Sequence, residues 1–302
     1  LMAVSGSKDF ALDVAEYIEE AFERCGSEVR TGYDLKTAKR SLNLLLADWS
    51  NRGLNRWTIE QKTLTLADSI ADYPLGTLPM TVGASGSFTV GETLTGGTSA
   101  ATASITSKPS STTMAITVPS GTFTNGETLT GGTSAATTTL SSAVDLTDVQ
   151  ASIDVLSMVV REDNDTSSQS DIRMSRVSRD DFISIPSKRT TGKPTQFYID
   201  RSLTPVIKLW PMPDSSTKYV LVYDRLTRMD DADTFTNSAE VPFRFYPCLV
   251  AGLSYYLSIK RAPDRVPLLK AAYEEEFQRA ASEDRDRASL SLTPGRDYYS
   301  VI

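Results

Sequence analysis

The side chains that could do chemistry in this chain are mostly carboxylates, because its 302 residues include no histidine. Histidine is the commonest general base and a frequent metal ligand. Its absence excludes Ser/His and Cys/His nucleophile pairs and every His-ligated metal site. Cys25 and Cys248 are the only cysteines, too few for a zinc cluster or a disulfide scaffold. Free cysteines usually behave as small apolar residues, and we expect both to be buried.

Two short patterns resemble ligand-binding loops without meeting their requirements. Gly192-Lys193-Pro194 resembles the end of a phosphate-binding loop, but proline stands where that loop needs a serine or threonine. Asp163, Asp165 and Ser167 alternate as in a calcium loop, yet the glycine and the glutamate that such a loop needs further on are missing. We interpret both stretches as solvated loops.

The other carboxylates gather near the C-terminal end. Residues 274–276 are three glutamates, which we interpret as an exposed helix face because nothing around them would shift their pKa values. The charges then alternate, and we expect this run to set the register of subunit contacts. The run consists of Glu283, Asp284, Arg285, Asp286 and Arg287. No constellation supports catalysis, so the sequence predicts a protein that is not an enzyme and uses no cofactor or metal.

Apolar residues at helical spacing predict two helices near the N-terminus. The first spans residues 10–25 and stops at Gly26. The second is capped by Asp34 and ends at Gly53. It carries Trp49, which could stack on nucleic-acid bases but is more often a core residue at this spacing among leucines.

The C-terminal helices form a hairpin within residues 241–281. Pro247 and Pro267 are tolerable only in the first turn of each helix, and Asp264 is placed to cap the second. One face of the hairpin is apolar and needs partners, and only the N-terminal helices can supply them, which predicts a single bundle. The residues expected to pack the bundle or ring are Trp49, Trp57, Leu249, Gly252, Leu253 and Tyr256.

Between the helices the apolar pattern changes to a period of two residues, which predicts strands. Proline and glycine turns separate them, as at residues 192–194 and 211–214. No helical crossover is available between these strands, so we expect an antiparallel sheet domain. The expected strands are residues 63–66, 153–160, 172–177, 196–199, 206–210 and 219–223.

A segment rich in Gly, Ser, Thr and Ala contains an internal repeat. Residues 86–102 return 35 positions later as residues 121–137, with GETLTGGTSAAT in both copies. Each copy predicts a strand centred on Phe88 or Phe123, a tight turn, a Thr/Leu strand, a Gly-Gly turn and a Thr-rich strand. Disorder is the alternative, but regularly placed Phe and Leu residues and the turn glycines favour a folded, duplicated β insert.

The predicted fold class is therefore α+β: a helical bundle formed by N- and C-terminal helices, with a central antiparallel β domain and a repeated β-rich insert. The net charge of −7 argues against a nucleic-acid coat. No run of about 18 apolar residues and no signal segment is present, so we expect no membrane contact. The expected ranges are 1–79 and 241–286 for the bundle, 147–240 for the β domain, 80–146 for the insert and 287–302 for an extended C-terminal tail.

Six stretches, taken together in chain order, carry a resemblance to a known family. The stretches are 42–57 (LNLLLADWSNRGLNRW), 192–198 (GKPTQFY), 209–213 (LWPMP), 241–245 (VPFRF), 251–257 (AGLSYYL) and 284–287 (DRDR). Over roughly residues 10–79 and 147–294, the chain resembles the head-to-tail adaptor, or connector, proteins of short-tailed bacteriophages. The repeated insert departs from the family pattern and interrupts it after residue 75.

The resemblance implies a non-enzymatic virion protein at the head-to-tail interface, synthesised in the host cytoplasm. Twelve copies would form a ring beneath the portal protein, with the bundle as the ring and the β part facing the tail nozzle or hub and possibly the fibres. Genomic DNA would pass through without specific binding. The C-terminal tail would reach the portal through Arg296, Tyr298, Tyr299, Val301 and Ile302.

Two other function classes remain open from the residues. The insert could be an adhesin-like recognition module that binds host glycans, which predicts aromatic clusters at its loop tips. Only Phe88 and Phe123 are available, and we expect them in the core. A polysaccharide-cleaving tail enzyme would instead need a pair of carboxylates in a cleft.

Overall fold

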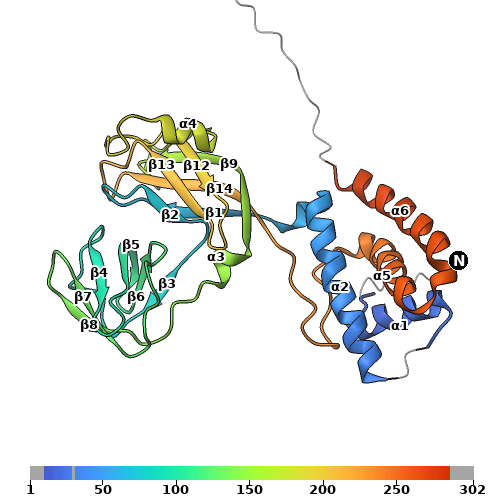
Figure 1. Ribbon diagram of the computed structural model, residues 1–302. Coiled ribbons are helices and arrows are strands. Elements are labelled where there is room, and N and C mark those ends of the chain that lie inside the picture. The colour runs from blue at the N-terminus through green and yellow to red at the C-terminus, as the bar shows by residue number, and fades with distance from the viewer. Residues whose placement is uncertain (1–9, 29–30, 286–302) are drawn as a thin grey trace, which may run out of the picture. The chain divides into compact units, whose positions relative to one another are not determined.

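The computed structural model describes residues 10–28 and 31–285. Over these residues the chain has helices toward both ends and three sheets between them (Figure 1), which confirms the predicted α+β class. The chain divides into two compact units. Leu1–Trp57 together with Met229–Ile302 is called the helical unit below, and Thr58–Arg228 is called the β unit.

These boundaries differ from the expected ones at residues 79 and 241. Strand β1 (Ile59–Thr65) pairs along its whole length with β14 (Tyr219–Thr227), so the chain has already entered a sheet before residue 79. At the other boundary, Met229 is already buried in the core of the helical unit. The two chain crossings between the units therefore lie next to the paired strands β1 and β14.

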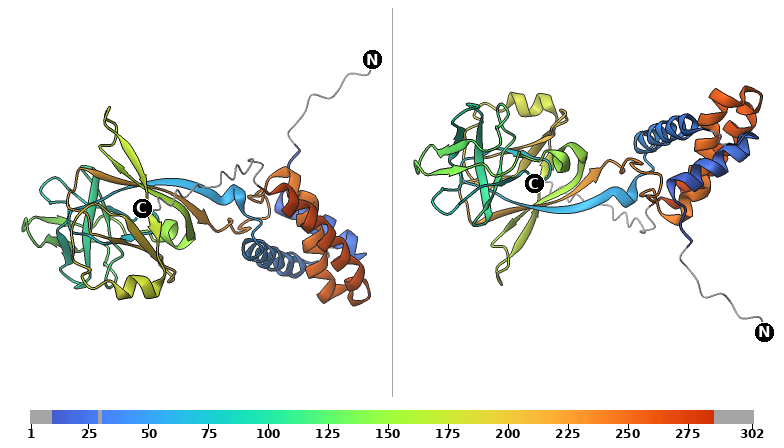
Figure 2. Two further views of the ribbon diagram at one scale, coloured as in Figure 1. Left: turned by 90° about the horizontal axis from the view of Figure 1, so that it is seen from above. Right: turned by 90° about the horizontal axis from the view of Figure 1, so that it is seen from below.

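Among the described residues, four long helices build the helical unit: α1 (Val14–Cys25), α2 (Gly32–Arg52), α5 (Tyr246–Arg261) and α6 (Val266–Glu283). Helix α5 packs against each of the other three (Figures 1 and 2). Short 3-10 turns precede β1, α5 and α6, namely η1 (Arg56–Thr58), η2 (Phe243–Phe245) and η3 (Pro263–Arg265). The bundle thus joins helices from both ends of the chain around α5.

The N-terminal helices end where the sequence predicts, but α2 begins at a different cap. Helix α1 starts with a capping box centred on Asp13. Gly26 and Gly53 end α1 and α2 in the left-handed region, with φ of 72° and 83°. Thr31, not Asp34, caps α2, because its hydroxyl accepts the Asp34 N–H at 3.3 Å.

The C-terminal hairpin begins its helices at the predicted prolines. Pro247 and Pro267 lie in the first turns of α5 and α6. The predicted cap of α6 is wrong: Asp264 lies inside η3, and the residue at the cap position, Arg265, makes no side-chain capping bond. The 3-10 turn continues directly into α6, so its backbone takes the place of a side-chain cap.

Small and apolar side chains fill the core of the helical unit. Cys25 and Cys248 belong to this core, as predicted from their residue type. The Cys25 Sγ donates to the backbone oxygen of Ser254 at 3.3 Å, and Ser254 is itself fully buried. A small residue at position 254 therefore lets α1 approach the backbone of α5.

Two four-stranded sheets share the core of the β unit, with strand orders β1-β14-β9-β10 and β11-β12-β13-β2. Their other strands are β2 (Asp72–Pro74), β9 (Ser152–Glu162), β10 (Ser170–Arg173), β11 (Ser175–Arg176), β12 (Gln196–Asp200) and β13 (Val206–Trp210). Strands pair antiparallel, as predicted, except that β11 and β12 pair in parallel. A short helix, α4 (Arg179–Ser184), lies between these two strands and provides the crossover that the sequence analysis did not foresee.

The insert is folded and forms a sheet of order β3-β6-β5-β4-β7-β8. Its elements are β3 (Pro79–Thr81), β4 (Thr93–Gly96), β5 (Thr102–Ser110), β6 (Thr113–Ile116), β7 (Thr128–Gly131), β8 (Thr137–Thr139) and, at its end, α3 (Thr147–Ala151). The predicted Thr/Leu and Thr-rich strands are β4, β5, β7 and β8. The predicted Phe-centred strands are wrong, because Phe88 and Phe123 lie in loops from which their rings fill the core of the insert.

The two copies of the repeat pair with each other through equivalent strands. Thr95 of β4 lies opposite Thr130 of β7, and these two positions are themselves 35 residues apart. The pairs to either side exchange equivalent positions: Leu94 lies opposite Gly131, the counterpart of Gly96, and Gly96 lies opposite Leu129, the counterpart of Leu94. The copies are therefore related by a local two-fold symmetry centred on Thr95 and Thr130, and their contact is isologous.

Candidate functional site

The aromatic residues predicted to pack the bundle lie inside the helical unit. Trp49 is fully buried, and its Nε1 donates to Tyr273 Oη at 3.1 Å. Trp57 is half-buried, and its ring stacks on Phe245 with the centroids 5.0 Å apart. The Trp57 Nε1 donates to the backbone oxygen of Glu240 at 2.9 Å. Both indole N–H groups are thus used within one copy of the chain.

Gly252 allows α5 to approach α2 and α6 closely. A Cβ at this position would lie 2.8 Å from the Leu45 methyl groups and 2.9 Å from Tyr273 Cε2, both closer than carbon atoms normally approach. The close approach brings the predicted packing residues of α5 into or beside one core, and these are Leu249, Leu253 and Tyr256.

Within the alternating charges at the C-terminal end, Asp284 has an internal role. Its side chain is buried, and Oδ2 accepts the backbone N–H groups of Asn55 and Arg56 at 3.1 and 3.2 Å. Glu283 and Arg285 are exposed. Asp284 therefore ties the end of α6 to the chain beyond α2 within one copy.

The remaining predicted contact residues lie outside the described residues. They are Asp286 and Arg287 of the charged run, and Arg296, Tyr298, Tyr299, Val301 and Ile302 of the C-terminal tail.

An open groove of about 540 Å³ runs between α1 and the start of α5 in the helical unit. Its apolar lining includes Phe10 and Phe243, which are 71% and 73% exposed. Four glutamates of α1 also line it, together with Arg24. We call this feature the α1 groove. The sequence analysis missed it, because Phe10 and Phe243 are far apart in the sequence and only the packing of α1 on α5 brings them together.

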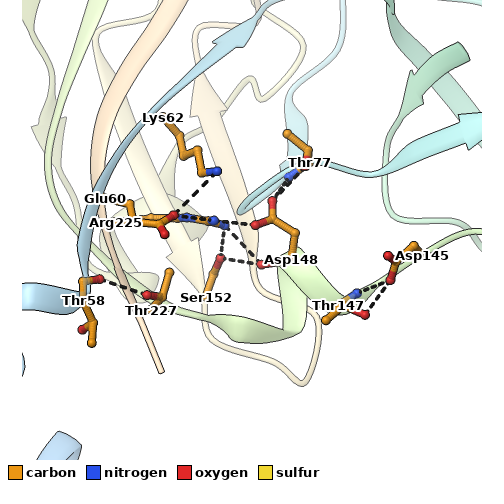
Figure 3. Close-up of polar contacts among 10 residues, drawn as sticks. All are labelled: Thr58, Glu60, Lys62, Thr77, Asp145, Thr147, Asp148, Ser152, Arg225 and Thr227. Carbon is orange, nitrogen blue, oxygen red and sulfur yellow. Dashed lines mark hydrogen bonds and ion pairs between the residues drawn. The ribbon is translucent and has the colours of Figure 1, made fainter. Parts of the chain in front are cut away.

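A buried arginine lies at the base of the insert in the β unit, among polar partners (Figure 3). The Arg225 side chain, on β14, is 2% exposed. Its Nη1 donates to Ser152 Oγ at 2.7 Å and to the Asp148 backbone oxygen at 3.1 Å. Its Nη2 donates to Glu60 Oε2 at 2.9 Å and forms a short ion pair with Asp148 Oδ1.

The second carboxylate oxygen of Asp148 binds the other side of the insert's base. It accepts the N–H of Thr77 at 2.6 Å and the Thr77 hydroxyl at 2.9 Å. Next to it, Gly76 has φ of 127°, and a Cβ there would meet Arg225 Nη1 at 2.8 Å. One carboxylate therefore joins the point where the chain enters the insert to the point where it returns.

The electrostatics of this cluster favour its charged form. Burial raises the pKa of Asp148, but hydrogen bonds from Arg225 and Thr77 outweigh burial and hold the pKa below its usual range. The hydrogen bond from Arg225 likewise lowers the pKa of Glu60. Because the guanidinium is almost wholly buried, the cluster anchors the insert and is not placed to meet a ligand from solvent. We call it the Arg225 clamp.

The Arg225 clamp had one signal in the sequence. Along β14 the buried positions alternate through Leu221, Tyr223 and Arg225, so an arginine occupies an inward position of a strand. A buried guanidinium requires a carboxylate partner. The sequence does not indicate which one, because Asp148 lies 77 residues away on α3.

Two buried glutamates connect the copies of the repeat. Glu92 of the first copy accepts the N–H groups of Thr133 and Ser134 in the second copy, at 3.1 and 2.9 Å. Glu127 of the second copy accepts the N–H groups of Thr98 and Ser99 in the first, at 3.0 and 2.9 Å. Each carboxylate also accepts the serine hydroxyl of the turn it contacts. The contacts are equivalent after a shift of 35 residues.

These hydrogen bonds determine the charge state of both glutamates. Burial raises the pKa of Glu92, but the donors of Ser134, Thr89 and Thr133 outweigh burial and lower it. The same balance lowers the pKa of Glu127. The sequence analysis saw the repeated glutamate but treated each copy as separate hairpins, so it missed the reciprocal exchange.

Among the residues that the structure describes, no group of three or more Cys, Asp or Glu side chains could hold a metal ion. None of the described helices combines the length and the apolar composition of a bilayer span. The Arg225 clamp and the two glutamates of the repeat hold backbone segments of the β unit together.

Comparison with known protein families gives one match, to the SU10 adaptor protein family over residues 100–297. This range covers more than half of the chain. The chain belongs to that family. It is thus a bacteriophage adaptor, and the predicted resemblance is confirmed at this level. No curated protein matches the chain.

The family match extends from the first copy of the repeat through β14, α5 and α6 into the C-terminal tail. As a phage adaptor, the protein is a structural component of the virion and contacts other virion proteins. The surfaces of this adaptor, in particular the α1 groove, are accordingly candidates for contacts with other virion proteins.

Proposed function

We propose that this adaptor joins the capsid portal to the tail and lines the channel through which DNA leaves. The observation that carries the proposal is the family match over residues 100–297, which makes the chain a phage adaptor. Twelve identical copies would form a closed ring through heterologous contacts, in which one surface of each copy binds a different surface of the next. The helical unit would supply these lateral contacts.

The axial contacts would come from other parts of the chain. The C-terminal tail, residues 287–302, would bind the portal protein, because aromatic and aliphatic side chains next to an arginine are common anchors of interfaces. The β unit would face the tail nozzle or hub, and possibly the fibres. DNA would pass without specific binding, since a net charge of −7 repels its phosphates.

The glycan-binding alternative receives no support from the insert. Its two aromatic residues, Phe88 and Phe123, are buried, so neither ring is available to stack on a sugar. The insert's outer face carries threonines, including Thr95 and Thr130, which are frequent on exposed strands for their β propensity.

A truncated chain tests the proposal. A chain ending at Asp286 is expected to fold and to form rings but to lose binding to the portal protein of the same virus, because the tail anchors are gone. Electron micrographs of the mixture, with class averages, report whether a ring caps the portal. A full-length chain with Ser289→Ala and Ser291→Ala is the control and should bind. Retained binding by the truncated chain would contradict the proposal that the tail binds the portal protein.

A further inference from the structure

Two solvent-exposed stripes on the helical unit carry opposite charges. On α1, Glu16, Glu19, Glu20 and Glu23 follow one another at helical spacing along the α1 groove. We call them the acidic stripe. On α2, an exposed row contains Tyr33, Lys36, Arg40 and Leu44. We call this row the basic stripe, and its apolar ends are 71% exposed at Tyr33 and 55% exposed at Leu44.

Each stripe is electrostatically incomplete within one copy. Glu19 and Glu23 stand four residues apart and have no ion-pair partner among the described residues, and the same holds for Lys36 and Arg40. Like charges at this spacing repel each other and destabilise a helix. By contrast, Glu20 pairs with Arg24 at 2.9 Å. The charges of both stripes are therefore available for ion pairs with another molecule.

The two stripes do not neutralise each other in the same copy. Helices α1 and α2 both pack their buried faces against α5, and no ion pair joins the two stripes among the described residues. In a closed ring, a heterologous contact brings the acidic stripe of one copy against the basic stripe of the next.

We propose that the acidic stripe and the α1 groove of one copy receive the basic stripe of the next copy, and that this contact closes the ring. The inference rests on the proposed function, for which it names the lateral interface. Lys36 and Arg40 would lie opposite Glu19 and Glu23, since residues four apart on any α-helix are about 6 Å apart along the axis. Leu44 would enter the groove beside Phe10 and Phe243.

The two kinds of contact contribute differently. Exposed ion pairs add little affinity individually but fix the register and exclude wrong partners. The apolar residues of the groove and Leu44 supply the burial that holds the copies together. Lys39 takes no part, because its amine is already used inside the unit, over the Phe235 ring and on the Asp233 backbone oxygen.

Charge reversal tests the pairing. Glu19→Lys with Glu23→Lys places lysines opposite Lys36 and Arg40. Lys36→Glu with Arg40→Glu places glutamates opposite Glu19 and Glu23. Each full-length variant is expected to weaken ring formation by about tenfold or more, because like charges then meet at every interface. The chain with all four substitutions restores opposite charges in exchanged positions and should recover ring formation to within about threefold.

Native mass spectrometry of the purified proteins at low salt measures the copies per particle, alone and with the portal protein as a template. Arg173→Glu with Arg189→Glu is the control for Lys36→Glu with Arg40→Glu, because it makes the same charge change at exposed positions of the β unit and should leave ring formation unchanged. Recovery in the fourfold variant also shows that the substituted helices still fold.

The possible results of these experiments test the proposed interface and the proposed function separately. Rings in the wild type and in every reversal variant would overturn the interface and leave the adaptor ring standing. So would a fourfold variant that folds but stays monomeric. If the wild type forms no ring, either alone or on the portal, the proposed function fails and the interface fails with it.

Zero-length cross-linking adds a direct readout of the same contact. Carbodiimide joins carboxylates to amines that form ion pairs, so a ring mixed from two isotope-labelled preparations should give links between Glu19 or Glu23 of one copy and Lys36 of another. Links confined to single copies would contradict the proposal.

Discussion

At the scale of single residues, the Arg225 clamp keeps a charged guanidinium almost entirely out of contact with water. A guanidinium that is 2% exposed has lost its water, and its Nε has no hydrogen-bond partner among the described residues. The ion pair with Asp148 and the hydrogen bond to Ser152 compensate for that loss. Removing one partner of such a pair costs more than the pair contributes, because the other charge stays buried.

Asp148→Asn is therefore expected to lower the free energy of unfolding of the β unit by about 3 kcal/mol at neutral pH. Urea denaturation followed by circular dichroism measures it. Asp145→Asn is the matched control, since Asp145 is exposed and binds only Thr147. It should cost less than about 1 kcal/mol.

The pH dependence of the same variant gives the sign of the interaction. The folded pKa of Asp148 lies below its usual value of 3.8, so its contribution is present above that pH and is lost as the pH falls through the lower folded pKa. The difference between the wild type and Asp148→Asn should consequently shrink in acid. A difference that stays constant down to about pH 2 would contradict the ion pair.

At the scale of elements, the insert is an internal dimer formed by one chain. The strands β4 and β7 meet about a local two-fold axis, and the glutamates exchange across it. A single copy would lose its partner strand and would leave its Thr-Ser turn without a carboxylate. The duplication therefore supplies a packing surface that one repeat lacks.

The local symmetry predicts equal effects at equivalent positions. Glu92→Gln and Glu127→Gln each turn an acceptor into a donor that faces backbone N–H groups, and each should cost about 1–3 kcal/mol. The two losses should agree within about 0.5 kcal/mol, because the donors are the same in both turns. Hydrogen exchange of the turn amides, read by mass spectrometry, should show the loosened turn in the other copy. Loosening of the variant's own copy alone would refute the exchange.

At the scale of the whole molecule, the insert leaves and rejoins the β unit at one place. Thr77 and Asp148 are hydrogen-bonded, so the ends of the excursion are already held together. The insert has its own hydrophobic core, separate from that of the two four-stranded sheets. Only α3 adds a buried residue to the insert's core from its return side, Val149.

Replacement of residues 79–145 by a short Gly-Ser linker should therefore leave the rest of the chain folded. Leu78→Ser and Val149→Ser are included in this chain so that neither of the buried side chains that pack on the insert's core is left exposed. Circular dichroism and native mass spectrometry should show retained helices and retained assembly. The same deletion combined with Asp148→Asn should unfold at a lower urea concentration than the deletion alone. Failure of the first chain to fold would mean that the insert is required for the β unit.

The amino-acid sequence by itself determined the features that depend on neighbouring residues. Gly26 and Gly53 end helices because only glycine enters the left-handed region without strain, and Pro247 and Pro267 mark helix starts because proline has no N–H to leave unpaired. The repeat and the α+β class were also predictable from the sequence, because a recurring segment and a hydrophobic period are visible along the chain.

Only the tertiary structure decided which distant residues meet. Asp148 finds Arg225, and Glu92 finds the turn at Ser134, across separations that leave no trace in local pattern. The acidic and basic stripes lie on helices that both pack against α5, and this packing decides which of their residues stay exposed. Helix caps, turns and hydrophobic periodicity connect residues that lie only a few positions apart in the sequence. The pairing of buried charges depends on how whole elements come together in space.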